Sequence, residues 1–186
     1  MTGPLTTPDA RTFRDTVGLF ATGVAVIVAR AAGEVLAMTA NAVSSVSLDP
    51  MLMMFCPSKK SNLASHLNEL DGFSINILRN DQQALSTYFA GGWKEGTPPP
   101  FRLIGTDRAP RLEGALASIH CEPWKMLDVG DHIMVFGRVL SLQRGIGPLD
   151  PLLFFSGRYR HVRAADSAPA PDLSDVQDEP AHIYYG

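Results

Sequence analysis

The sequence predicts a mainly β protein, an antiparallel barrel with flanking helices. Short apolar runs rich in Val and Ile recur along the chain and are bounded by Gly, Pro, Asn or Asp, a pattern typical of strands. The sequence pattern predicts no helix of convincing length after Phe89. The strands expected in the second half therefore follow one another without regular helices, which favours an antiparallel barrel over a doubly wound sheet.

The first half of the chain predicts a mixture of helices and strands. The first is an amphipathic helix through Phe13, Val17 and Phe20 that ends near Gly23, and it is followed by a hairpin over 24–43 with strands at 23–29 and 35–43. A buried strand at 51–56 comes next, and then a helix through Leu63, Leu67 and Leu70 that stops at Asp71-Gly72. A half-buried strand at 73–78 and a short helix at 82–89, capped by Asn80-Asp81, complete this half. A long loop follows at 90–100, of a kind often found as a lid or a subunit contact. The second half predicts strands at 116–121, 132–139 and 152–155, separated by Glu122-Pro123, Val129-Gly130-Asp131 and a Gly-Pro segment at 145–148.

Composition points to one globular domain. The chain has 186 residues, 45% of them hydrophobic and 19% charged, with a net charge of −3. We expect a flexible start at 1–10, a domain over 11–163 and an acidic, proline-containing tail at 164–186 that either docks through its final aromatics or stays free. This balance gives no basic surface for nucleic acid, and no run is long enough for a membrane span. With no secretory signal and with Cys56 and Cys121 outside any metal or disulfide spacing, we expect a cytoplasmic protein with reduced thiols and no metal.

Several familiar sites are absent from the sequence. There is no GxGxxG fingerprint, no GxxxxGK[ST] loop, no HExxH and no GxSxG elbow. A nucleotide that binds here does so without a Rossmann unit or a P-loop.

An uncharged polar stretch at 38–62 is the best candidate for a cofactor site. No charged residue lies between Glu34 and Asp49, and hydroxyl and amide side chains alternate with small apolar ones. Such a lining suits a flat, polar, uncharged heterocycle. Lys59 and Lys60 then precede a helical pattern, where free N–H groups and positive charge suit a phosphate. The alternative for this second half is ordinary N-capping by Ser61 beside two solvated lysines.

Three further side chains could contact a ligand. His132 begins an apolar strand after Gly130-Asp131, where a neutral imidazole would hydrogen-bond a ligand amide or relay a proton, or simply be a satisfied structural histidine. Asp131 either orients that ring or completes the turn. Phe89 and Tyr159 lie beside glycines, where each packs on a planar ligand or on the core.

The order of these segments resembles the flavin reductase-like family, the reductase components of two-component flavin monooxygenases. The resemblance covers roughly residues 11–162. It rests on Phe13-Arg14, Thr22-Gly23-Val24-Ala25-Val26, Met38-Thr39-Ala40-Asn41-Ala42, Ser45-Val46-Ser47-Leu48-Asp49-Pro50, Lys60-Ser61, Phe73–Leu78, Asp81-Gln82, Phe89-Ala90-Gly91, Gly130-Asp131-His132 and the region from Pro151-Leu152 to Tyr159. Asn62, Met51 and Ala37 depart from the residues common in the family.

The resemblance implies an FMN-binding split barrel, a homodimer, and hydride transfer from NADH or NADPH to FMN or FAD. It also implies a partner flavin-dependent monooxygenase that receives the reduced flavin by diffusion. His132 is expected to position the nicotinamide, with no covalent role. Thr39 and Asn41 are expected to donate hydrogen bonds to the flavin ring, and the 58–62 segment to hold phosphate. The full set expected to bind the flavin is Met38, Thr39, Ala40, Asn41, Ala42, Ser45, Val46, Ser47, Cys56, Ser58, Lys59, Lys60, Ser61, Asn62, Phe89 and Tyr159.

Two other functions remain compatible with the sequence. One is a tailoring oxidoreductase that retains its flavin and acts directly on an organic substrate, in a pocket built from the 91–100 loop and the tail. The other is a non-catalytic flavin-binding protein on the same barrel.

Overall fold

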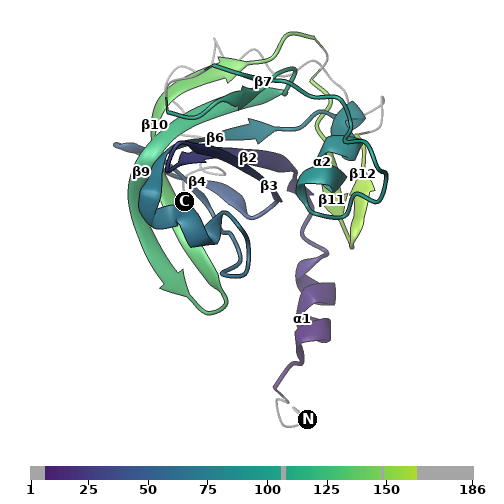
Figure 1. Ribbon diagram of the computed structural model, residues 1–186. Coiled ribbons are helices and arrows are strands. Elements are labelled where there is room, and N and C mark those ends of the chain that lie inside the picture. Colours follow the sequence, from purple (N-terminus) through teal and green to yellow (C-terminus); the bar gives the residue numbers. More distant parts are fainter. Residues whose placement is uncertain (1–6, 106–107, 148, 163–186) are drawn as a thin grey trace, which may run out of the picture.

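A computed structural model describes residues 7–105, 108–147 and 149–162, and its described part is mainly antiparallel β-structure with few helices (Figure 1). The helices are α1 (Ala10–Val17), the 3₁₀ turns η1 (Ala64–Glu69) and η2 (Asn80–Gln82), and α2 (Gln83–Phe89). The strands are β1 (Thr22–Gly23), β2 (Ala25–Ala31), β3 (Glu34–Ala40), β4 (Val43–Leu48), β5 (Met51–Phe55), β6 (Leu70–Ile77), β7 (Leu103–Ile104), β8 (Arg111–Leu112), β9 (Ala117–Val129), β10 (His132–Arg144), β11 (Leu153–Phe155) and β12 (Arg158–Arg160). The mainly β, antiparallel prediction is confirmed.

The main sheet has seven strands in the order β3-β2-β6-β9-β10-β5-β4, so β3 and β4 lie at its opposite edges. These two edge strands are nevertheless consecutive in the chain, because only Asn41 and Ala42 separate them. Three Cα–Cα steps span at most about 11 Å, so the end of β3 and the start of β4 must lie close together. The sheet is therefore strongly curved, as the bend of the long β9–β10 hairpin shows (Figure 1).

Both faces of the sheet are covered by apolar side chains, which explains the continuous apolar run of β2. Ala25, Ile27 and Ala29 belong to one buried cluster, together with Phe55 and Phe73. The alternate residues of the same strand belong to a second cluster, whose members are Val24, Val26, Val28, Leu78, Leu85, Leu112, Ala115 and Leu152. Successive side chains of a strand point to opposite faces, so β2 contributes to both clusters.

The second cluster lies under α2 and the small sheet β1-β11-β12, which are neighbours in the structure (Figure 1). The Ser86 hydroxyl in α2 and the Tyr159 hydroxyl in β12 are hydrogen-bonded at 2.9 Å. This contact joins the helix to the small sheet across the end of β3.

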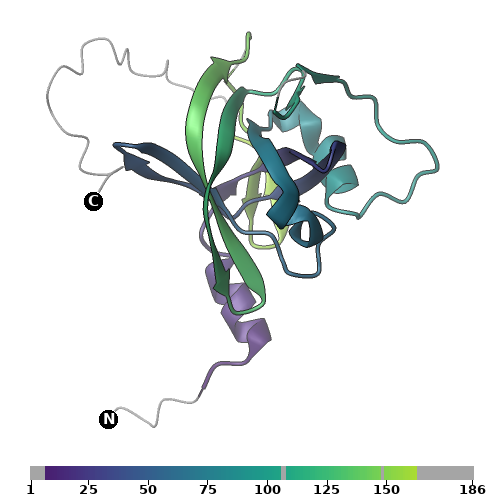
Figure 2. The same ribbon diagram turned by 60° about the vertical axis from the view of Figure 1, so that its left-hand side comes forward.

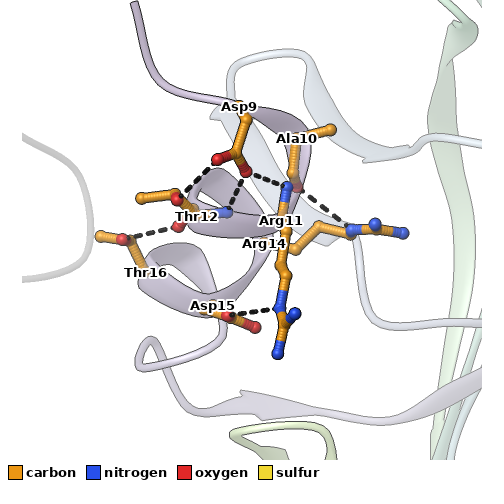
Figure 3. Close-up of polar contacts among 7 residues, drawn as sticks. All are labelled: Asp9, Ala10, Arg11, Thr12, Arg14, Asp15 and Thr16. Atoms are coloured by element: carbon orange, nitrogen blue, oxygen red, sulfur yellow. Dashed lines mark hydrogen bonds and ion pairs between the residues drawn. The ribbon is translucent and has the colours of Figure 1, made fainter. Parts of the chain in front are cut away.

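The N-terminal helix α1 forms where the sequence predicts it but is shorter. Asp9 caps it, because its Oδ1 accepts hydrogen bonds from the backbone N–H groups of Arg11 and Thr12 at 2.8 Å each (Figure 3). The helix ends at Val17, with Gly18 as its C-cap, and not near Gly23. It projects away from the sheet in both views (Figures 1 and 2), and none of its residues is buried.

Several predicted strands have different ends in the structure. The strand expected over 35–43 stops at Ala40, because Asn41 and Ala42 carry the chain to the other sheet edge. The strand expected to end before Glu122-Pro123 continues through both residues to Val129. β6 pairs with β9 only as far as Cys121, so Pro123 lies where β9 has one neighbouring strand, and such a position tolerates a missing N–H.

Two local predictions for the middle of the chain are wrong. The segment with Leu63, Leu67 and Leu70 was expected to be a helix that stops at Asp71-Gly72. It forms a 3₁₀ turn that ends at Glu69, and β6 begins at Leu70. The helix at 82–89 is preceded by η2, whose cap is formed by Arg79 and Gln82 and not by Asn80-Asp81. The Gln82 side chain accepts a hydrogen bond from the Arg79 N–H at 2.9 Å, and this bond forms the cap that was expected from Asn80-Asp81.

The strand at 73–78 was expected to be half-buried, but β6 lies inside the sheet, and its Ser74 and Asn76 side chains are fully buried. Asn76 donates to Val26 O at 3.0 Å and to Ser74 Oγ at 2.9 Å. Its Oδ1 accepts from the Leu112 N–H and the Ser118 hydroxyl, both at 2.9 Å. One amide therefore satisfies partners on three neighbouring strands and one on its own strand, and the alternation of polar residues marks this network and not a solvent face.

We expect Asn76→Ala to destabilise the fold by about 3 kcal/mol, because it leaves several buried polar groups without partners. Urea denaturation followed by circular dichroism measures the change. The matched control is Asn68→Ala at an exposed position of η1, for which we expect a change within about 0.5 kcal/mol. An Asn76→Ala protein as stable as the control would contradict the role of this network.

Candidate functional site

The predicted ring-binding residues lie at the junction between the two sheet edges. Met38, Thr39 and Ala40 end β3, whereas Asn41 and Ala42 are exposed in the link to β4. The register of β4 against β5 shifts between Ser45 and Ser47, so Val46 is the extra residue of a bulge, with 44% of its surface exposed. Bulges bend an edge strand and redirect its side chains. The structure thus brings the predicted hydroxyls and amides to one exposed edge.

A small cavity of about 160 Å³ opens beside this junction. Its lining consists of Val24, Thr39, Asn41, Ser86, Ala90, Phe154 and Tyr159. The Thr39 hydroxyl donates to the carbonyl oxygen of Ser86 at 2.7 Å, so Thr39 offers an acceptor to a ligand, not the donor that the sequence predicts. Tyr159 also lines this cavity, and its hydroxyl is hydrogen-bonded to that of Ser86 at 2.9 Å.

Phe89 has a different environment. Its ring packs edge-on against Phe101 and Tyr88 at centroid distances of 5.0 Å each, and it is part of the covering of the second core cluster. Of the two alternatives from the sequence, packing within the protein is the one that the structure shows for Phe89. The same residue is absent from the lining of the small cavity.

The predicted phosphate-binding segment joins the ring-binding link directly. The Cys56 N–H donates to Ala42 O at 3.2 Å, which holds the two segments side by side. Ser58 Oγ accepts from the Lys60 N–H at 3.3 Å, and Ser61 Oγ accepts from the Ala64 N–H at 3.2 Å. Ser61 therefore binds the first N–H of the following 3₁₀ turn, although Leu63 occupies its N-cap position, while Lys59, Lys60 and Asn62 stay exposed.

His132 begins β10 beside the same segment. Ser58 and His132 form an isolated antiparallel bridge, and the Lys59 N–H donates to Asp131 O at 3.0 Å. The His132 ring is 2.8 Å from Asp131, between Nδ1 and Oδ1, and this hydrogen bond is the first cause of a lowered pKa for the Asp131 carboxyl. An ionised carboxylate only accepts, so Nδ1 carries the hydrogen and Nε2 of the neutral ring is an acceptor. Asp131 thus orients the ring, as one of the two sequence alternatives stated.

The charges of this region are paired across the two segments. Lys59 Nζ lies 2.5 Å from Asp128 Oδ1 near the end of β9. The charge of Lys60 is a further, weaker cause of the lowered pKa of Asp131. The sequence did not predict Asp128 as a site residue, because nothing in its local pattern places the end of β9 beside Lys59.

The two cysteines carry no reactive thiolate. Burial raises the pKa of the Cys56 thiol, and it raises the pKa of Cys121 to about 12. Both thiols are therefore protonated near neutral pH, and Cys56 contributes to the site through its backbone N–H. Ser86, which also lines the small cavity, was not predicted from the sequence. Its one signal in the sequence is a hydroxyl that follows the apolar Leu85 in a short predicted helix.

Other features of the described residues do not compete with this site. A cavity of about 380 Å³ lies elsewhere, against Phe73, Arg108, Arg111, His120, Cys121 and Ser141, and contains none of the predicted site residues. Within the described ranges, no group of three metal-binding side chains occurs. None of the helices described is long and apolar enough to cross a membrane.

The chain is similar to known proteins over most of its length. A family model described as a flavin reductase like domain matches residues 17–163. The chain is 33% identical over 175 residues to a protein of Rhodococcus jostii named flavin-dependent monooxygenase, reductase subunit HsaB, covering 91% of this chain and 86% of that one. It is 34% identical over 151 residues to the FMN reductase (NADH) SmoA of Agrobacterium fabrum, covering 81% of this chain and 85% of that one.

The fold has relatives of known structure. The flavin reductase PheA2 in its native state superposes with a TM-score of 0.77 at 37% identity, covering 84% of this chain and 99% of that one. The family model covers most of the chain, and the matches extend over nearly the whole length of these relatives. The resemblance carried by the segments between Phe13 and Tyr159 is therefore confirmed, and the chain belongs to the flavin reductase like family.

Proposed function

We propose that this protein is an NAD(P)H-dependent flavin reductase that transfers hydride from nicotinamide to FMN or FAD and supplies reduced flavin to a partner flavin-dependent monooxygenase. The observation that carries the proposal is the continuity of three segments: the uncharged link at Asn41-Ala42, the lysine-bearing segment from Ser58, and His132. The hydrogen bond from Cys56 to Ala42 joins the first two, and the bridge between Ser58 and His132 joins the last two.

The residues present fit a flavin by their donor and acceptor set. A bound flavin supplies the acceptor for a hydride, and the reaction needs no nucleophile from the protein. Thr39 offers a lone pair, the Asn41 amide offers both a donor and an acceptor, and the Ser58–Asn62 segment offers hydroxyls and positive charge. No charged side chain occurs in the sequence between Glu34 and Asp49, so this segment places no charge beside the ring.

His132 has the geometry of a positioning residue for the nicotinamide. Its Nδ1 is committed to Asp131, so its Nε2 is the atom left to accept a hydrogen bond from a carboxamide N–H. The lowered pKa of Asp131 keeps that carboxylate ionised through the neutral range. The ring therefore keeps one tautomer while the substrate exchanges.

An anaerobic titration tests the proposed function. We expect NADH or NADPH to bleach the visible absorbance of FMN or FAD in stoichiometric amounts, with the reduced flavin released in the absence of any third substrate. Persistent absorbance would instead indicate a non-catalytic flavin-binding protein. Reduced flavin that is retained until an organic substrate is added would indicate a tailoring oxidoreductase.

We expect His132→Ala to raise the KM for the nicotinamide nucleotide about threefold to tenfold, the effect of one lost hydrogen bond, with a smaller change in flavin Kd. Steady-state kinetics and flavin fluorescence quenching measure the two constants. His132→Gln, which keeps an acceptor, should recover part of the loss. Gln143→Ala, an exposed position at the other end of β10, is the matched control. Equal steady-state constants for His132→Ala and the wild type would remove His132 from the site.

The proposal includes a homodimer built on a split barrel, and α1 supports the dimer. An isolated eight-residue helix is marginal in water, yet α1 buries none of its residues on this chain. Its apolar side chains are highly exposed, Phe13 by 61% and Val17 by 52%, as is Phe20 just beyond its end, by 76%. A second copy, related by a twofold axis, would cover this side and would offer its own α1 in return. The exposed ends of the long hairpin, at Trp124 and Leu127, provide further apolar surface.

We expect the wild-type protein to elute at twice the chain mass of 20.1 kDa in size-exclusion chromatography with light scattering. The double substitution Val17→Asp and Phe20→Asp should shift it to the single-chain mass, because two charges would be buried without partners. Arg11→Glu on the opposite side of the helix is the matched control and should leave the dimer intact. A wild-type protein of single-chain mass would contradict the dimer.

A further inference from the structure

Lys59 of the 58–62 segment is paired with a carboxylate from the end of β9. Its Nζ lies 2.5 Å from Asp128 Oδ1. The charge of one lysine of this segment is thus compensated at the place where a phosphate would bind. An uncompensated cation would bind phosphate more strongly.

The pairing is imposed by the backbone and not by flexible side chains alone. The Lys59 N–H donates to Asp131 O at 3.0 Å, and the Ile133 N–H donates to Pro57 O at 3.0 Å. The bridge between Ser58 and His132 lies between these two bonds. The segment and the β9–β10 turn therefore form one unit, which holds the backbone of Lys59 beside the end of β9.

The pairing does little for the stability of the fold. The side chains of Lys59 and Asp128 are 38% and 75% exposed, and exposed ion pairs of this kind contribute little to folding. A phosphate group that uses Lys59 must either share the ammonium with the Asp128 carboxylate or replace it, and in both cases it lies near that negative charge. The ion pair of Lys59 and Asp128 therefore affects mainly the affinity of Lys59 for an anion.

We propose that Asp128 is an affinity-determining residue, which competes with the flavin phosphate for Lys59 and so keeps the flavin exchangeable. The inference rests on the proposed function and deepens it: the bound flavin is held as a substrate that leaves, not as a prosthetic group. The relevant chemistry is a terminal phosphate or diphosphate on a neutral ring system. Asp131 holds His132, so Asp128 is the residue through which affinity is separable from nicotinamide positioning.

The test compares FMN with riboflavin, which has the same ring and ribityl chain but no phosphate. We expect Asp128→Asn to bind FMN about threefold to tenfold more tightly than the wild type, in flavin fluorescence quenching at low ionic strength, while riboflavin affinity is unchanged. The gain should shrink at high salt, because the charges are exposed. In a Lys59→Gln background the same substitution should give a smaller gain.

Glu113→Gln is the matched control. It removes one carboxylate from another exposed ion pair, with Arg102 at 3.3 Å, and should leave the ratio of the FMN and riboflavin constants at the wild-type value. The proposal is overturned if Asp128→Asn leaves that ratio unchanged or strengthens both flavins equally. Failure of the proposed function is a separate result: a wild-type protein that binds FMN with the expected ratio but does not reduce it with NADH or NADPH.

Discussion

The short link between β3 and β4 is the constraint on which the rest of the structure depends. Two residues, Asn41 and Ala42, connect strands that lie at opposite edges of a seven-stranded sheet. A link of this length is possible only if the sheet curves until its edges approach each other. The curvature leaves an exposed, uncharged peptide segment at the junction, and the phosphate-binding candidate segment is hydrogen-bonded directly to it through Cys56.

The site that results uses two kinds of electrostatic balance. In the proposed site, the link offers neutral donors and acceptors to a ring whose charge changes on reduction. In the 58–62 segment, the charge of Lys59 is compensated by Asp128 at the end of β9. Both features suit a protein that must bind a flavin, reduce it and let it go. Tight binding would require fewer compensating carboxylates.

Local patterns predicted the elements well where one neighbour determines the structure. The hairpin over 24–43, the buried strand β2 and the turn at Gly130 follow from propensity and, at Gly33 and Gly130, from positive φ angles that glycine accommodates. The predictions failed where a distant strand decides the outcome. Pro123 lies within a strand because β6 pairs with β9 only as far as Cys121, and Asn76 is buried because strands pack on both sides of β6.

The sequence by itself determined the chemistry of the site: an uncharged hydroxyl- and amide-rich stretch, two adjacent lysines, and a histidine after Gly-Asp. These are properties of residue types in a fixed order, and the family resemblance depends on that order. Only the tertiary structure decided which partners these groups have. Thr39 donates to Ser86, Phe89 packs on Phe101, and Lys59 meets Asp128, which is distant in sequence. Hydrogen bonds and ion pairs depend on distances between strands, and those distances exist only after the sheet has curved.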